Sequence, residues 1–404
     1  MYCSPPSLLS YGHQLIEDDD VAAVAAALRG EYLTCGPLVE AFERQLAEVV
    51  GARYAVACSS GTAALHLAAM ALGLSAKDRV LVPSMTFAAT ASAARIAGAE
   101  VVFLDVDPGT GLLDLGSLER ILEGEDGKKA SAIIPVHLNG QCVDMEPLLR
   151  LARRHDLKVI EDATHALGGS YLTQDGNEVR VGACRHSDMA VFSFHPVKTI
   201  AMGEGGALTT NDEGLYRRLL LLRSHGIVRD ASSFVNEDLA HDADGEANPW
   251  YYEVQEIGLN YRASDIHCAL GLSQLKKLDR FVARRRQLAE RYDALLGALA
   301  PAIRPLAKSA HCRPAWHLYV ILVNFESLGI SRAKFMQRLR QQNVGTQVHY
   351  LPVHLHPYYR NRYGAVRCPG AEAYYRQALS LPLHPGMDNG DVDRVVEAIR
   401  CAVN

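Results

Sequence analysis

The stretch from residue 192 to residue 206, FSFHPVKTIAMGEGG, decides the fold prediction because it places a lysine between a strand and a glycine-rich turn. The residues 188–193 (DMAVFS) predict the strand, and Lys198 follows it by a few positions. The glycines within 203–206 let the backbone adopt positive φ values and approach a ligand closely. A lysine in such a turn is most often a surface residue when it stands alone, so its meaning depends on the segments around it.

Three features upstream of Lys198 are each placed to meet a ligand. The strand predicted at 158–161 (KVIE) leads into Asp162, and ligands of open α/β sheets lie beyond the carboxyl ends of strands. The segment 59–65 (SSGTAAL) runs from a strand into a helix, where backbone N–H groups bind anions. Phe87 can lie flat on an aromatic ring. Singly, these features are ordinary helix caps and a core phenylalanine, but their order and spacing together indicate a cofactor site.

Composition excludes several classes of protein. The chain has 404 residues, 49% of them hydrophobic and 22% charged, which is ordinary for a globular protein with two domains. A net charge of −5 argues against a nucleic-acid binder. Nine cysteines without a CxxC pair predict neither a disulfide framework nor a metal site. The N-terminus lacks the pattern of a signal peptide, and the apolar runs are too short to span a membrane, so we expect a cytoplasmic protein.

Short β-branched runs alternate with helical stretches from about residue 50 to 225, which predicts an α/β layer sandwich with a mostly parallel sheet. The predicted strands are 54–58, 79–82, 101–105, 131–136, 158–161, 188–193 and 206–210. Helices are expected between them, as at 62–73 and 145–155.

The remainder of the chain departs from this alternation. Residues 227–256 are acidic and aperiodic, which predicts a long loop. A long amphipathic helix is expected at about 264–298. The last part, 303–404, mixes short strands and helices and predicts a smaller α+β domain.

These blocks, with GLNYRASDIHCALGLSQL at 258–275, resemble the fold-type I enzymes that use pyridoxal 5′-phosphate (PLP). Within that group the chain resembles the sugar aminotransferase family named after DegT, DnrJ, EryC and StrS, over essentially residues 10–400. The resemblance implies a three-layer sandwich. It also implies a large PLP-binding domain at 1–260, followed by a linking helix and a small C-terminal domain at 261–404.

The resemblance implies a role for each matching residue. Lys198 would hold PLP as a Schiff base, and Asp162 would pair with the pyridine nitrogen and keep it protonated. A related branch that dehydrates sugars has histidine at the lysine position, so Lys198 favours transamination. The other implied cofactor residues are His165 near the ring hydroxyl, Phe87 stacked on the ring, Gly61, Thr62 and Ser193 at the phosphate, and Asn260 reaching that phosphate from a second subunit.

Substrate residues are less sharply indicated. The resemblance places His349 and Tyr350 near the substrate, although ordinary packing of the small domain accounts for them equally well. Arg223 and His225, in the motif RSHG, either line the entrance to the site or cap a helix. The run at 284–286 (RRR) either attracts a diphosphate or, as we favour, forms a solvated helix face.

The segments 193–212, 223–227, 250–279 and 347–354 most resemble the branch of the family that acts in pseudaminic acid biosynthesis. That branch implies transfer of the amino group of glutamate to C4 of a UDP-linked 4-keto-6-deoxy-N-acetylhexosamine, in a homodimer with shared active sites. The acidic segment 236–248 departs from its pattern.

Three other functions remain open at this point. One is an aminotransferase for another nucleotide-linked keto-sugar, and a second is an aldolase or lyase with the same fold. The third is a regulatory protein that only binds a ligand, which the presence of Lys198 and Asp162 disfavours.

Overall fold

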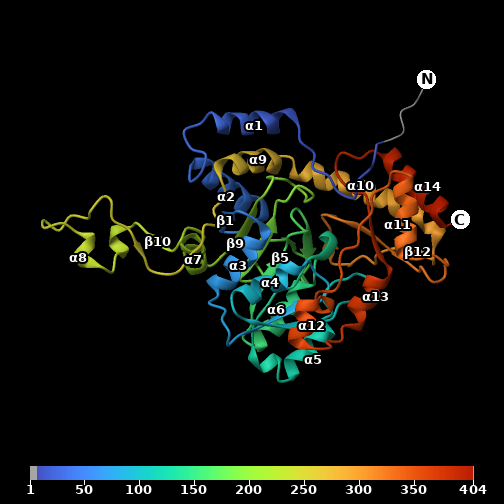
Figure 1. The fold of residues 1–404 in the computed structure, drawn as a ribbon, viewed down its shortest axis with the longest axis horizontal. Coiled ribbons are helices and arrows are strands. Elements are labelled where there is room, and N and C mark those ends of the chain that lie inside the picture. Colours follow the sequence, from blue (N-terminus) through green and yellow to red (C-terminus); the bar gives the residue numbers. More distant parts are fainter. Residues whose placement is uncertain (1–6, 404) are drawn as a thin grey trace.

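The protein is described by a computed structural model that covers residues 7–403 (Figure 1). A seven-stranded sheet at its centre has the order β1-β9-β8-β5-β4-β2-β3. Neighbouring strands of this sheet pair in parallel, except that β9 runs antiparallel to both β1 and β8. The predicted mostly parallel α/β sandwich is therefore confirmed.

The longer elements follow one another in this order: α1 (Asp18–Leu28), α2 (Pro37–Val50), β1 (Tyr54–Cys58), α3 (Gly61–Ala71), β2 (Arg79–Pro83), α4 (Ala88–Ile96), β3 (Glu100–Leu104), α5 (Leu115–Glu123), β4 (Ala130–Ile133), α6 (Met145–Arg154), β5 (Lys158–Asp162), β6 (Ser170–Leu172), β7 (Glu178–Arg180), β8 (Met189–Ser193), β9 (Gly206–Thr210), α7 (Glu213–Arg223), β10 (Ile227–Val228), α8 (Glu237–Ala240), β11 (Glu253–Val254), α9 (Asp265–Leu275), α10 (Leu278–Leu296), β12 (Ile303–Pro305), β13 (Cys312–Arg313), β14 (Tyr319–Val323), α11 (Arg332–Gln341), α12 (Pro357–Tyr363), α13 (Pro369–Gln377), β15 (Ala378–Leu381) and α14 (Asn389–Val403).

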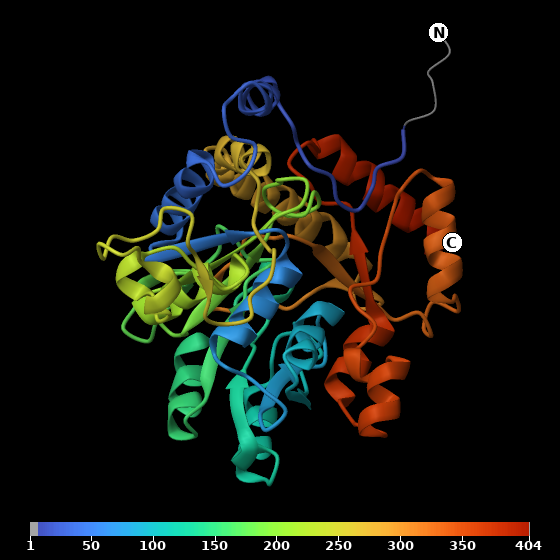
Figure 2. The same ribbon diagram turned by 60° about the vertical axis from the view of Figure 1, so that its left-hand side comes forward.

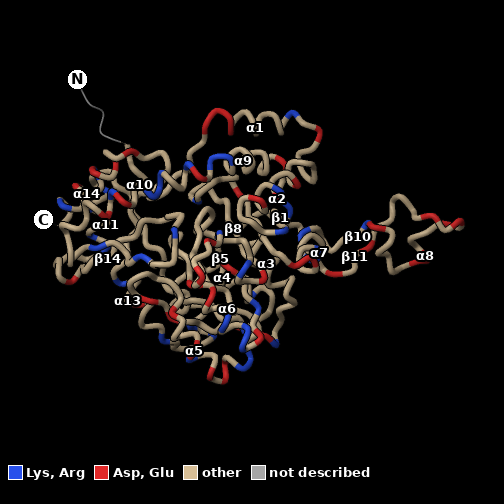
Figure 3. Tube along the Cα trace, turned by 180° about the vertical axis from the view of Figure 1, so that it is seen from behind, with Lys and Arg blue, Asp and Glu red and all other residues tan. Residues whose placement is uncertain are grey.

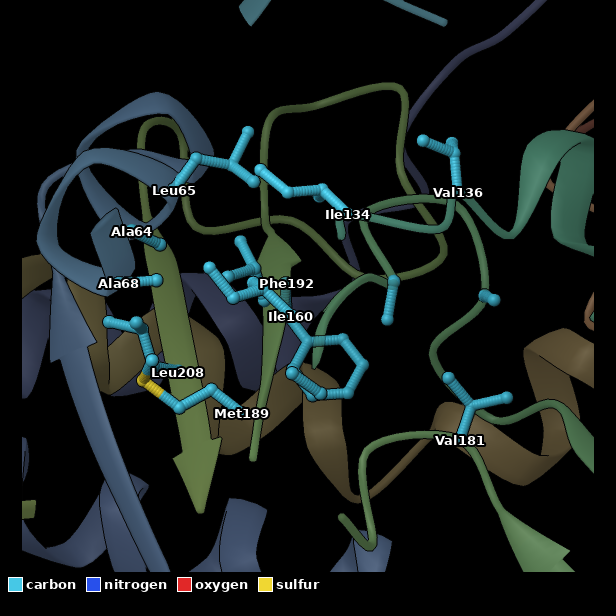
Figure 4. Packing of buried hydrophobic residues seen from close by; sticks show 14 of the residues in the cluster. Ala64, Leu65, Ala68, Ile134, Val136, Ile160, Val181, Met189, Phe192 and Leu208 are labelled. Carbon is cyan, nitrogen blue, oxygen red and sulfur yellow. The ribbon is translucent and has the colours of Figure 1, made fainter. Parts of the chain in front are cut away.

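The predicted strands of the large sheet are all present, each with ends shifted by a few residues at most. Their central residues are buried on both faces because helices cover the sheet on both sides, as expected for parallel strands. Figure 4 shows one such contact, where Ala64, Leu65 and Ala68 of α3 lie near Phe192 and Leu208 of the sheet. Small alanines on α3 allow this helix to lie close to the sheet, which brings its N-terminus to the carboxyl end of β8.

Residues 227–256 form an arm that projects from the body of the molecule (Figure 1). The prediction of a loop holds for most of this segment, but β10 and β11 pair antiparallel at its base and α8 forms a single short helix. Acidic residues are frequent along the arm (Figure 3). The segment is thus an ordered projection with a two-stranded base.

The prediction of one long helix at 264–298 is wrong, because α9 ends at Leu275 and α10 begins at Leu278. Between them, the ammonium of Lys277 binds carboxylates of Glu17, Asp19 and Asp20 at the start of α1. This cluster of charges fixes the junction, and it joins residues that are far apart in the sequence.

The last part of the chain contains an antiparallel sheet of β12, β14 and β15, which α10, α11 and α14 cover. The N-terminal segment joins it, since Leu9 pairs with Val344 and the carbonyl of Tyr11 accepts the N–H of Leu383. Figure 2 shows this segment beside the C-terminal helices before the chain turns into α1. Within residues 7–403, no helix is long and apolar enough to cross a membrane.

Candidate active site

A pocket of about 560 Å³ lies at the carboxyl ends of the parallel strands β5 and β8. The structure brings most of the sequence-predicted site residues together there. Those that line it are Gly61, Thr62, Phe87, Asp162, Ser193, Lys198, His349 and Tyr350. Segments from both halves of the chain therefore build one site.

Asp162 ends β5, and its side chain is held by two threonines. Thr90 donates a hydrogen bond to one carboxylate oxygen across 2.7 Å. The other oxygen accepts the hydroxyl of Thr164 at 2.7 Å and its N–H at 3.2 Å. Because the carboxylate is buried and these donors fix it, it is presented to the pocket in one orientation.

Lys198 lies in the turn that follows β8. The backbone N–H of Lys198 donates a hydrogen bond to the carbonyl of His195 at 2.8 Å, which sets the shape of this turn. Burial lowers the pKa of its amine to about 8, and the nearby carboxylate of Asp162 offsets this only in part. A large fraction of Lys198 is therefore neutral slightly above neutral pH, which is the form that attacks carbonyl carbons.

The N-terminus of α3 forms a concave cradle beside Lys198. A Cβ atom on Gly61 would lie 2.7 Å from the Cβ of Ser193, so only glycine fits there. Gly206 is equally restricted, because its Cβ would lie 2.2 Å from the carbonyl oxygen of Ser60. The hydroxyl of Ser60 caps the helix at the N–H of Ala63. Free N–H groups and hydroxyls at a helix N-terminus make an anion site suited to a phosphate.

One wall of the pocket is aromatic. Phe87 is the N-cap residue of α4 and has 57% of its surface exposed, and its ring centroid is 5.7 Å from that of Tyr350. An exposed phenyl ring of this kind is available to stack on a flat heteroaromatic ring.

Three buried histidines lie behind the lysine. The hydroxyl of Tyr350 hydrogen-bonds to Nε2 of His165 at 3.2 Å, and the His165 ring is 4.4 Å from that of His317. His349 hydrogen-bonds to the hydroxyl of Ser380 at 2.7 Å. Burial lowers the pKa of each of these histidines, to about 3 for His349, so all three are neutral near pH 7.

These residues fit PLP by shape and by chemistry. The cradle of Gly61, Thr62 and Ser193 suits the phosphate, Phe87 suits the ring face, and Asp162 suits the pyridine nitrogen. Lys198 is the amine available for a Schiff base. His165 contacts the site through its hydrogen bond to Tyr350, and its position at the ring hydroxyl stays a prediction.

Four predicted residues do not line the pocket of their own chain: His165, which lies behind Tyr350, and Arg223, His225 and Asn260. Arg223 ends α7 and pairs with Glu43, and it also donates to the carbonyl of Ala57 at 2.7 Å. Since Glu43 accepts the N–H of Ala57, the pair covers the open edge of β1. His225 lies in the left-handed turn that follows, with φ of 65°. Within its own chain Arg223 thus holds the edge of β1, and a role of Arg223 and His225 at the substrate stays a prediction.

Asn260 is exposed and bridges to Ser224. The carbonyl of its neighbour Tyr261 accepts the N–H of Ser59, so Asn260 lies on the surface next to the phosphate cradle. Its predicted reach into a second subunit stays a prediction.

Sequence reasoning missed several groups of the site. Thr90 lies on the same segment as Phe87, but its bond to Asp162 depends on how α4 meets β5. Tyr11, His317 and Gln347 also line the pocket. The expected solvated face at 284–286 is wrong, because the three arginines donate to main-chain carbonyls.

Comparison with known proteins identifies the family of the chain. The sequence matches the DegT/DnrJ/EryC1/StrS aminotransferase family over residues 14–400. The spore coat polysaccharide biosynthesis protein SpsC of Bacillus subtilis is 38% identical over 395 residues, which are 97% of this chain and 96% of SpsC.

Solved structures agree as well. Helicobacter pylori PseC, an aminotransferase involved in the biosynthesis of pseudoaminic acid, superposes with a TM-score of 0.86 at 28% identity, covering 98% of this chain and 99% of PseC. Spr1654 of Streptococcus pneumoniae, in its PLP form, gives a TM-score of 0.85 at 26% identity and 98% coverage of both chains. The form of Spr1654 that contains pyridoxamine phosphate (PMP) also matches, with a TM-score of 0.84. The chain therefore belongs to the DegT/DnrJ/EryC1/StrS aminotransferase family and is a PLP-dependent sugar aminotransferase.

Proposed function

We propose that the protein transfers the amino group of glutamate to C4 of a UDP-linked 4-keto-6-deoxy-N-acetylhexosamine, the step that pseudaminic acid biosynthesis requires. The observation that carries this choice of sugar is the similarity to PseC along nearly the whole of both chains. The general reaction has separate support from Lys198 and Asp162, which lie in one pocket.

Each of the main residues of the pocket has a separate role in transamination. Bound PLP supplies an electron sink for the charge that develops on the substrate carbon. The carboxylate of Asp162, fixed by Thr90 and Thr164, favours the protonated pyridine that makes this sink effective. The amine of Lys198, once free, moves a proton to or from the reacting carbon, and its lowered pKa keeps enough of it neutral to act as a base.

The charges of the two substrates are not balanced by the pocket of one chain. Glutamate carries two carboxylates, and a UDP-sugar carries a diphosphate. Among the described residues, no arginine lines the pocket, and burial keeps two of its histidines, His317 and His349, neutral. This imbalance supports a contribution of positive charge from a second subunit.

A homodimer with shared active sites accounts for two further features. Asn260 is exposed beside the phosphate cradle rather than inside it. The arm at 227–256 and the residue after it expose large apolar side chains, among them Val235 (75%), Trp250 (73%) and Ile257 (78%). Such side chains on a projection are typical of a surface that a partner covers.

A second candidate is amination of a different nucleotide-linked keto-sugar. The specific observation that favours it is the 38% identity to SpsC, a spore coat polysaccharide protein, which exceeds the 28% identity to PseC. The acidic arm also favours this second candidate, because it departs from the pattern of the pseudaminic acid branch.

In the deciding experiment, the purified protein is incubated with glutamate and with each of three ketones in parallel. These are UDP-2-acetamido-2,6-dideoxy-β-L-arabino-hexos-4-ulose, its D-xylo epimer, and a dTDP-linked 4-keto-6-deoxyglucose. Products are identified by mass spectrometry and compared by kcat/KM. We expect the L-arabino ketone to give the highest value, and preference for either alternative would reject the pseudaminic acid assignment while leaving sugar amination intact.

A further inference from the structure

Cys142 and Cys312 lie side by side although 170 positions separate them in the sequence. Cys142 follows the turn at 138–140, and Cys312 begins β13, which pairs with β6. The backbone N–H of Cys142 donates to Sγ of Cys312 across 3.0 Å, and the Cys142 thiol donates to the carbonyl of Ser170 at 3.5 Å. Neither residue lines the pocket around Lys198.

The two thiols differ in exposure and in acidity. Cys312 is partly exposed, whereas Cys142 has only 1% of its surface exposed. The Cys142 thiol, its backbone N–H and the positive charge of Arg286 lower the pKa of Cys312. Arg286 is held in place because it donates to the carbonyls of Arg313 and Pro314, directly after Cys312.

This arrangement sets the pair apart from the buried cysteines of the chain. Burial raises the pKa of Cys58, Cys184, Cys268 and Cys368 to about 12, so these remain inert thiols at neutral pH. A cysteine that is oxidised to a disulfide needs thiolate character, access and a neighbouring thiol that resolves its first oxidation product. Cys312 with Cys142 meets these three conditions.

We propose that Cys142 and Cys312 form an oxidation site that reacts with a peroxide and closes to an intramolecular disulfide. The Cys312 thiolate attacks one oxygen of hydrogen peroxide, which forms a sulfenic acid and releases hydroxide. The Cys142 sulfur then attacks the Cys312 sulfur, which forms the S–S bond and releases the oxygen as water. Over both steps, two thiols lose two protons and two electrons in all, and one peroxide becomes two waters.

The disulfide would join two segments that already support the active site. The loop before Cys142 carries Asn139, whose carbonyl accepts the N–H of His317 at 3.0 Å. The N–H of Asn139 donates to Nδ1 of His165 at 3.3 Å. His317 follows Cys312 by five residues. The disulfide would therefore connect the segments that position His165 and His317.

The test needs no assumption about the sugar substrate. The wild-type holoenzyme is treated with equimolar hydrogen peroxide, alkylated, digested without reductant and mapped by mass spectrometry. We expect a peptide pair that links Cys142 to Cys312, lighter by two hydrogens than the reduced pair, to appear before modification of the exposed residues Cys35 and Cys401. Dithiothreitol should reverse it.

Two variants assign the roles of the two sulfurs. In Cys142→Ser, a sulfenic acid on Cys312 should persist and be trapped by dimedone. In Cys312→Ser, labelling of Cys142 should fall at least about tenfold, because a buried thiol of raised pKa reacts slowly. The matched control, Cys401→Ser, should leave the cross-link unchanged. Earlier oxidation of Cys35 or Cys401 in the wild-type map, with no linked peptide, would overturn the proposal whatever the variants do.

Discussion

The guanidinium of Arg285 donates a hydrogen bond to the main-chain carbonyl of Lys198, across 3.4 Å. The same side chain donates to the carbonyls of Trp316, His317 and Leu383, so one cation joins three segments around the pocket. It is completely buried, and no carboxylate of residues 7–403 forms a salt bridge with it. Burial accordingly lowers its pKa to about 10, while the four carbonyl oxygens solvate its charge.

Arg285→Met should destabilise the protein strongly, because several buried carbonyls lose their donor at once. We expect a loss of about 3 kcal/mol in the free energy of unfolding, measured by urea denaturation. Arg285→Lys keeps the charge but reaches fewer acceptors, so an intermediate loss is expected. Arg44→Gln serves as the control, since Arg44 is 73% exposed and should change stability little. Equal stability of Arg285→Met and the control would contradict this role.

Lys198→Ala should yield a protein that lacks the yellow colour of lysine-bound PLP and loses turnover by at least about 10³-fold. The reason is that no second lysine lines the pocket among the described residues. Absorbance spectra and product mass spectrometry are the measurements. Retention of both the visible band and the activity would exclude Lys198 as the residue that binds the cofactor.

The rate at which the apoprotein takes up PLP should rise with pH and level off above about pH 8. Burial lowers the pKa of Lys198, so its neutral, nucleophilic form accumulates as pH passes about 8, whereas an ordinary lysine would need a pH above 10. Stopped-flow absorbance from pH 6 to 10 measures this rate. A rate that still climbs at pH 10 would show an unshifted lysine.

Asp162→Asn should lower kcat about 10³-fold while the cofactor stays bound. A carboxylate about 4 Å from the pyridine nitrogen contributes about 4 kcal/mol at an effective dielectric of 20, or about three pKa units, and an asparagine lacks that charge. Thr90→Val keeps the charge and removes one hydrogen bond, so a smaller loss is expected from it. Equal losses from the two variants would show that orientation of Asp162 matters more than its charge.

Mixed dimers test the shared active site. Mixing inactive Lys198→Ala with inactive Asn260→Ala should restore about a quarter of wild-type activity, because half of the randomly formed dimers carry one site with both wild-type residues. The matched control mixes Lys198→Ala with Asp162→Asn. Those two residues lie in one pocket of one chain, so no intact site forms. Mixed dimers that form and remain inactive in the first experiment would reject the shared site.

The sequence by itself determined the order of the strands along the chain and the groups at their ends. Asp162, Lys198 and the cradle at 59–65 each follow a predicted strand within a few residues. Because parallel strands end at the same edge of a sheet, local patterns were enough to predict that these groups meet. The family resemblance added the identity of the cofactor.

Only the tertiary structure decided which side chains support those groups. Thr90 meets Asp162, Arg285 meets Lys198, and Lys277 between α9 and α10 meets Asp20, each across a separation that no local period reveals. Arg223, for which the motif left the site entrance and a structural role equally open, pairs with Glu43 at the edge of β1. The physical reason is the same in each case. A buried charge must find partners wherever the folded chain supplies them, and the sequence records the charge but not the partner.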